Sequence, residues 1–156
     1  MSEEIIGSFV VDKMRSWIWK SLLYPKMFMF VFTRNRLIGA KIGRKLILSD
    51  RKTRKMFDRI SMEGHKEGSL ESILEADKDN FEIPYSEIKK IEMKKASIAD
   101  NLWSAHRTGY SKTYAGTLEI HTLSKKDKFE ISSFRQDFEQ CVEVVRLVLT
   151  EKLVLK

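Results

Sequence analysis

The most apolar stretch of the chain, "MFMFVF" at residues 27–32, is followed by a segment in which charged and aliphatic residues alternate. A lysine and an arginine border the stretch, so it is far shorter than the roughly 20 apolar residues of a membrane-spanning helix. Arg34 and Asn35 can supply a tight turn, because asparagine tolerates a positive φ angle. The pattern therefore predicts a β-hairpin formed by residues 27–33 and 37–42.

Alternation of apolar and polar residues predicts further strands on both sides of this hairpin. The clearest case is "IKKIEMK", which begins at Ile88. "GTLEIHTL" and "KFEIS", separated by the polar turn "SKKDK", predict a second hairpin. The additional strands are expected at residues 5–11, around 46–48, and at 88–94, 117–123 and 128–132.

A long amphipathic helix is predicted after the second hairpin, at about residues 134–152. Ser133 and Gln136 have the spacing of a capping box, in which each side chain bonds the backbone of the other residue. Apolar residues then recur at steps of three and four, which indicates one wide face that packs on the open end of a curled sheet. These residues are Phe134, Phe138, Cys141, Val142, Val145, Val148 and Leu149. We interpret Cys141 as a small buried hydrophobic residue.

The segment from about residue 50 to residue 79 has few β-branched residues and two short helical patterns. The first pattern predicts a basic amphipathic helix with Met56, Phe57 and Ile60 on its apolar side. The second has Ser69 as its N-cap candidate, followed by apolar residues for packing, namely Leu70, Ile73 and Leu74. We interpret the segment as a helical insertion between β regions.

This order of elements resembles the pleckstrin-homology-like (PH-like) superfamily, especially its prokaryotic and GRAM-related members. The resemblance rests on "FMFVFTRNRLIGAKI", "IPYSEIKKIEMKK" and "GTLEIHTLSKKDKFEI" followed by "SSFRQDFEQCVEVVRLVL". It implies a mainly β (α+β) fold, a partly open barrel of two antiparallel sheets closed by a C-terminal helix. Residues 1–156 would form a single domain, and the insertion at 50–79 is a departure, because relatives usually have a short loop there.

Charge is distributed unevenly along the chain. Residues 13–66 contain 15 basic and 3 acidic side chains, a net charge of +12, which leaves −5 for the rest of a chain whose total is +7. Such polarity suggests an anionic partner. The candidate anion-binding residues are Lys41, Arg44, Lys45, Arg51, Lys52, Arg54 and Lys55. The alternative is a solvated basic surface without a partner.

Aromatic residues occur among cations in "MRSWIWKSLLYPK". Trp17, Trp19 and Tyr24 are therefore candidate interface residues, since these side chains favour the headgroup level of a bilayer and can also stack on nucleobases. The alternative is that one ring packs under the barrel.

Sequence patterns give no catalytic or metal site and no cofactor motif. His65, His106 and His121 have no histidine four residues away and no cysteine-rich neighbour with which to form a metal site. A calcium loop beginning at Asp77 would have Glu82 where glycine is required and a second mismatch at its twelfth position. "GAKIGRK" lacks the spacing of a phosphate-binding loop. Acid pairs such as Glu71 and Glu75 fit a solvated surface, and the chain is not expected to be an enzyme.

The leading expectation is a non-enzymatic PH-like binding or adaptor module that docks through its basic surface on membrane lipid headgroups or on an acidic protein face. The alternative is a nucleic-acid-binding protein that uses the same basic half with aromatic stacking. The acidic N-terminus lacks the features of a signal peptide, and one cysteine cannot form an internal disulfide. A cytoplasmic chain that binds the inner membrane face peripherally is expected; its oligomeric state stays open.

Overall fold

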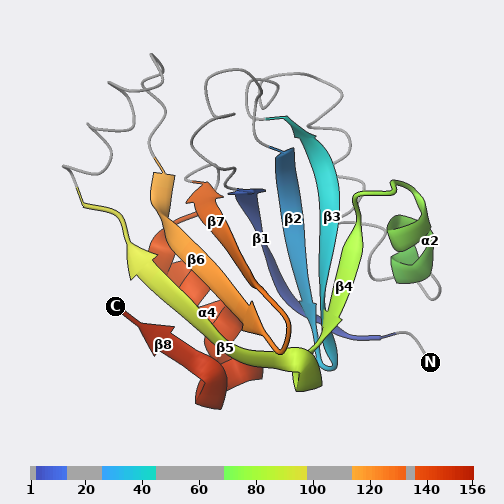
Figure 1. Cartoon of the computed structure of the whole chain (residues 1–156). Helices are drawn as coiled ribbons and strands as arrows, with labels where there is room; N and C mark the ends of the chain where they lie inside the picture. Colours follow the sequence, from blue (N-terminus) through green and yellow to red (C-terminus); the bar gives the residue numbers. More distant parts are fainter. Residues whose placement is uncertain (1–2, 14–25, 45–68, 98–113, 133–135) are drawn as a thin grey trace.

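The computed structural model describes residues 3–13, 26–44, 69–97, 114–132 and 136–156, and the fold of these residues is mainly β (Figure 1). Within them lie eight strands: β1 (Ile5–Lys13), β2 (Lys26–Thr33), β3 (Arg36–Arg44), β4 (Phe81–Pro84), β5 (Ile88–Lys95), β6 (Tyr114–Thr122), β7 (Lys126–Ser132) and β8 (Leu153–Leu155). The α-helices are α2 (Ser69–Glu75) and α4 (Phe138–Leu149), with short 3-10 helices at Tyr85–Glu87 and Thr150–Lys152. The expected mainly β class is confirmed.

The described strands belong to one sheet, in the order β4-β3-β2-β1-β7-β6-β5-β8. Strands β1–β4 form one antiparallel meander and β5–β7 form another. The two meanders join where β1 and β7 pair antiparallel near their C-terminal ends, with Val11 opposite Ile131. Strand β8 pairs parallel with β5, so the described strands form one mixed, open sheet where two antiparallel sheets were expected.

The predicted hairpin of "MFMFVFTRNRLIGAKI" is confirmed as β2 and β3, joined at Arg34 and Asn35. Thr33 stabilises the turn, because its Oγ1 accepts hydrogen bonds from the backbone amides of Asn35 (3.2 Å) and Arg36 (3.1 Å). The same hydroxyl donates to the carbonyl oxygen of Arg36. Thr33 is fully buried, so these bonds satisfy a polar group that could not reach water.

Strand β2 is apolar without interruption because both of its faces are buried. One face contributes Phe28, Phe30 and Phe32 to the main core, and the other contributes Met27, Met29 and Val31 to a second apolar cluster. Continuous apolar runs are typical of strands covered on both sides, whereas a strand with one wet face alternates. The six apolar residues therefore reflect a central strand of the sheet.

Helix α4 covers the main core. Its residues Cys141, Val142, Val145 and Leu149 are buried there against the sheet. Burial raises the pKa of the Cys141 thiol to about 12, so the side chain acts as the small hydrophobic residue predicted from the sequence. In Figure 1 the helix lies behind β5 and β6, and none of the described helices covers the opposite side of these two strands.

The predicted capping box at Ser133 and Gln136 is wrong, because the capping box of the structure lies four residues later, at Asp137 and Gln140. The helix begins at Phe138, and Asp137 accepts a hydrogen bond from the backbone amide of Gln140 while the Gln140 side chain accepts one from the backbone amide of Asp137. Gln136 has another role: its amide group exchanges two hydrogen bonds with the backbone of Val10, at 2.8 and 2.7 Å. It thereby ties the start of α4 to β1.

The second helical pattern of the insertion is confirmed as α2, whereas residues 50–68 lie outside the described residues. Leu70, with Ile73 and Leu74 beside it, packs against the second apolar cluster. Asn80 links the helix to β3, because its side chain donates to the carbonyl of Ile73 (2.6 Å) and accepts from the backbone amide of Lys41 (2.7 Å). No helix in the described part of the chain is long and apolar enough to cross a membrane.

Candidate functional site

Most segments outside the described residues are connected to strand ends that lie on one side of the described sheet. Figure 1 shows the ends of β1, β3 and β7 and the starts of β2 and β6 on that side. The pairings Asp12–Met27, Lys26–Arg44, Lys95–Gly116 and Tyr114–Ser132 place these ends next to one another. We call this group of strand ends the open rim. Segments 14–25 and 98–113 begin and end there, and segments 45–68 and 133–135 begin there.

The net positive charge of the protein belongs to these segments. The whole chain has 29 basic and 22 acidic residues, and the described residues contain 17 of each sign, so they are neutral as a set. The remaining 12 basic and 5 acidic residues account for the entire net charge of +7. A neutral sheet thus carries, at one rim, chain segments that are all neutral or basic.

Among the predicted anion-binding residues, Lys41 is the one whose side chain the structure describes. Its ammonium lies 3.0 Å from Asp79 and 3.9 Å from Asp77, while Lys26 lies 3.0 Å from the other oxygen of Asp79. Hydrogen bonds from Lys26 and Lys41 lower the pKa of Asp79 to about 2. In the described structure Lys41 is therefore paired with a loop carboxylate.

The other predicted site residues are not placed by the structure. Arg44 ends β3 at the open rim, but its side chain is outside the described set. The following residues also lie outside the described ranges: Lys45, Arg51, Lys52, Arg54 and Lys55, and the aromatic candidates Trp17, Trp19 and Tyr24.

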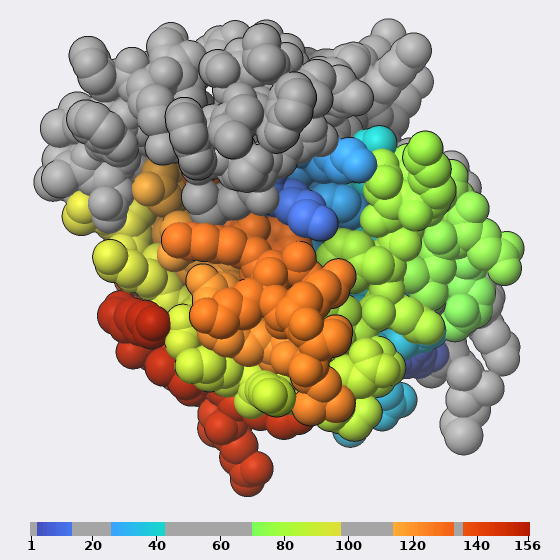
Figure 2. All heavy atoms as spheres, viewed as in Figure 1, coloured from blue at the N-terminus to red at the C-terminus, as the bar shows by residue number. Residues whose placement is uncertain are grey.

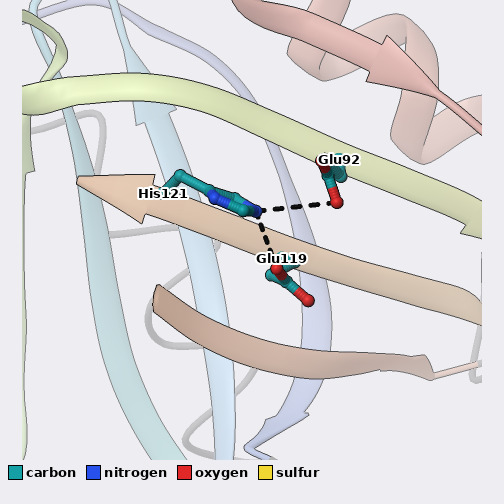
Figure 3. A group of neighbouring side chains, drawn as sticks. All are labelled: Glu92, Glu119 and His121. Atoms are coloured by element: carbon teal, nitrogen blue, oxygen red, sulfur yellow. Dashed lines mark ion pairs between the residues drawn. The ribbon is translucent and has the colours of Figure 1, made fainter. Parts of the chain in front are cut away.

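A second group of polar side chains lies on strands β5 and β6. Figure 3 shows His121 and Glu119 of β6 and Glu92 of β5 directed toward one another. The Nε2 atom of His121 is 2.7 Å from a Glu119 oxygen and 3.6 Å from a Glu92 oxygen. Alternation explains the grouping: Leu118 and Ile120 face the core, so Glu119 and His121 share the opposite face.

Two lysines also contact the Glu92 carboxylate. Lys90 lies 2.7 Å from one oxygen and Lys156 lies 2.9 Å from the other. Hydrogen bonds from these ammonium groups, Lys90 first, lower the pKa of Glu92 to about 2. Glu92 is therefore ionised at neutral pH, and its side chain is only 12% exposed.

Sequence reasoning missed this group because its members come from two strands that are far apart along the chain. The available signal was Glu119-x-His121, two ligand-type residues with the spacing that places both on one face of a strand. The register that sets Glu92 directly opposite Glu119 is not visible in the sequence.

Comparisons of the chain with family models, with curated proteins and with solved structures find no match.

Proposed function

We propose that the protein is a non-enzymatic, PH-like binding module that docks the segments at its open rim on an anionic partner, either membrane lipid headgroups or an acidic protein face. The observation that carries this proposal is the separation of charge: the described sheet is neutral, and the full +7 belongs to segments that leave or join it mainly at one rim. A neutral body whose basic segments leave it mainly at one rim would be suited to orientation on a negative surface.

The strand order and the final helix support the PH-like part of the proposal. Two antiparallel meanders follow one another, they join through β1 and β7, and α4 follows the last strand of the second meander onto the main core. The sequence phrases that resemble the superfamily correspond to β2–β3, to β4–β5 and to β6–β7 with α4. That the sheet curls into a partly open barrel is also part of this proposal.

Docking on a membrane is the more specific of the two versions of this proposal. Each Lys or Arg near an anionic leaflet adds about 1 kcal/mol of binding free energy. The predicted amphipathic helix would add contact of Met56, Phe57 and Ile60 with the interface. Arg51, Lys52, Arg54 and Lys55 would supply the charge, with the chain bound peripherally at the inner face of the membrane.

Vesicle flotation with the full chain tests the proposal. Binding to vesicles that contain anionic phosphatidylserine, and not to neutral vesicles, is expected at moderate salt. The variant R51Q/K52Q/R54Q/K55Q should lose most of this binding. The matched control removes four charges from exposed lysines of the neutral body, at Lys78, Lys89, Lys94 and Lys128, each replaced by glutamine. It should retain binding.

Three outcomes would contradict parts of the proposal. Equal losses in both variants would show diffuse charge attraction without a docking site. Binding to an acidic protein surface without binding to anionic vesicles would assign the rim to the protein partner. Retention of duplex or single-stranded DNA, with log affinity falling linearly with log salt, would favour the nucleic-acid alternative and overturn docking on lipid or protein.

A further inference from the structure

His121 has an unusual environment for a histidine on the side of β5 and β6 that faces away from α4. The residue is only 8% exposed, and its Nε2 atom is buried without a hydrogen bond among the described residues. The nearest Glu119 oxygen is close, at 2.7 Å, but its direction does not meet the geometry of a hydrogen bond. A buried ring nitrogen that faces two carboxylates without a directed hydrogen bond has an electron pair or a proton to satisfy.

We propose that Glu92, Glu119 and His121 form a binding site for a divalent transition-metal ion, for which Zn²⁺ is the best-fitting candidate. One ligand atom from each residue lies within 4.8 Å of the other two. Zinc binds imidazole nitrogen and carboxylate oxygen at about 2.0–2.2 Å, so tetrahedral ligands stand roughly 3.3 Å apart. The observed distances from Nε2, 2.7 and 3.6 Å, lie on either side of that separation.

The donor set selects the class of ion. An imidazole nitrogen with two carboxylate oxygens suits zinc and other first-row transition metals, whereas Ca²⁺ and Mg²⁺ prefer oxygen ligands alone. Three protein ligands also leave a fourth tetrahedral position for water or for a group from a partner. The site lies on the face formed by β5–β7, which Figure 2 shows between β8 on one side and α2 with β4 on the other.

Lys156 competes with the ion for Glu92. Its ammonium lies 2.9 Å from the Glu92 oxygen that also faces His121, and its side chain is 56% exposed, so it can turn into water. Lys90 contacts the other oxygen of Glu92 and can remain in place while the ion binds. The ion would therefore displace the Lys156 ammonium from Glu92, and the Lys156 charge weakens metal affinity, as does that of Lys126, 4.0 Å from the Glu119 oxygen that faces His121.

Isothermal titration of the full chain with zinc chloride tests the site. One zinc ion per chain is expected, with magnesium giving no comparable binding. His121→Gln and Glu119→Gln should each weaken zinc binding at least about tenfold. Glu119→Gln covers the case in which the buried His121 variant fails to fold, because the Glu119 side chain is more exposed, at 24%. Circular dichroism checks the fold of each variant.

Matched controls locate the binding. Glu87→Gln, which removes an exposed carboxylate outside the cluster, and the double variant His65→Gln/His106→Gln should both retain zinc binding. Absence of zinc binding in the wild-type chain, or binding that survives Glu119→Gln and His121→Gln, would overturn the proposal. So would its loss in the double variant, because the ion would then sit on another histidine.

Lys156→Gln is the most specific test. Removing the competing ammonium should tighten zinc binding several-fold, whereas Lys152→Gln, which removes a charge nearby in sequence without touching the cluster, should leave it unchanged. Unchanged affinity in Lys156→Gln would contradict the assignment of Glu92 as a ligand.

Discussion

Arg36 joins three separate parts of the described structure through its guanidinium group. It forms ion pairs with Glu3 before β1, with Glu71 of α2 and with Glu82 of β4. Burial of the group opposes its charge, but hydrogen bonds to the three carboxylates raise the pKa of Arg36 above its ordinary value. The Arg36 side chain is 17% exposed and Glu3 is 20% exposed, so this pair is shielded from water and salt, whereas the Glu71 and Glu82 carboxylates lie at the surface.

Replacing Arg36 by leucine should therefore lower the free energy of unfolding by about 1–3 kcal/mol, mainly because the largely buried Glu3 carboxylate loses its partner. Arg34→Leu is the control: its pair with Glu4 is exposed, and such pairs contribute less than about 1 kcal/mol. Denaturant unfolding of both variants measures the difference. Equal effects would mean that the Arg36 pairs contribute no more than a surface pair.

The low pKa of Asp79 predicts that the free energy of unfolding depends on pH. Its pKa is about 2 in the folded chain, below its ordinary value of 3.8, so the folded state binds fewer protons than the unfolded state in that interval. Its stabilising contribution is complete above about pH 5 and is lost as the pH falls toward 2. Asp79→Asn should flatten the curve of unfolding free energy against pH between these limits, whereas Glu75→Gln, at an exposed position, should not. Superimposable curves for wild type and Asp79→Asn would refute this contribution.

At the scale of elements, the close pairing of β5 and β6 depends on Gly116. A Cβ atom at this position would lie 2.4 Å from the backbone oxygen of Lys94 and 2.8 Å from the ring of Phe138. The backbone oxygen cannot move without separating the strands, so Gly116→Ala should lower the free energy of unfolding by about 1–3 kcal/mol. Thr117→Ala, on the adjacent residue, is expected to have a smaller effect. Thermal unfolding compares the two variants. Equal melting temperatures for Gly116→Ala and Thr117→Ala would show that β5 and β6 can shift to accommodate the added Cβ atom.

Elements with a strong apolar pattern could be predicted from the sequence. Both hairpins, the strand beginning at Ile88 and the helix after the second hairpin follow from alternation or from three- and four-residue steps, with bounds that differ by a few residues. Strands β4 and β8 could not, because four and three residues are too short to show a period. The start of α4 was misplaced because Gln136 bonds the backbone of β1, a contact that no local pattern reveals.

The two candidate sites also differ in how far they could be predicted from the sequence. A basic half is visible in the sequence because charge can be counted, but the pairing of Lys41 with Asp79 depends on how the loop after α2 folds back to β3. The cluster of Glu92, Glu119 and His121 depends on the register of two strands. Composition can therefore be read directly from the sequence, whereas strand register, which determines which side chains meet, cannot.

For the whole molecule, the proposed function predicts that the neutral body determines stability and that the basic segments determine binding. The variant R51Q/K52Q/R54Q/K55Q should change thermal stability little if these charges lie on the solvent side of the predicted amphipathic helix, since exposed charges usually contribute less than about 0.5 kcal/mol each. Thermal unfolding of the full chain measures this. An unfolded variant would mean that these residues are structural partners of acidic groups, and the assignment of the docking residues would be wrong.

The contact between Gln136 and Val10 has a consequence for the order in which the chain folds. The two residues are 126 positions apart, and the amide of Gln136 cannot reach β1 until residue 136 has left the ribosome. Contacts of such long range slow folding. During synthesis the first meander is complete before α4 exists. Its apolar strand β2 is then not covered by that helix, and such exposed apolar surface is prone to aggregation. Lys26 and Arg34 flank that strand with positive charge, the kind of gatekeeper that keeps nascent chains apart.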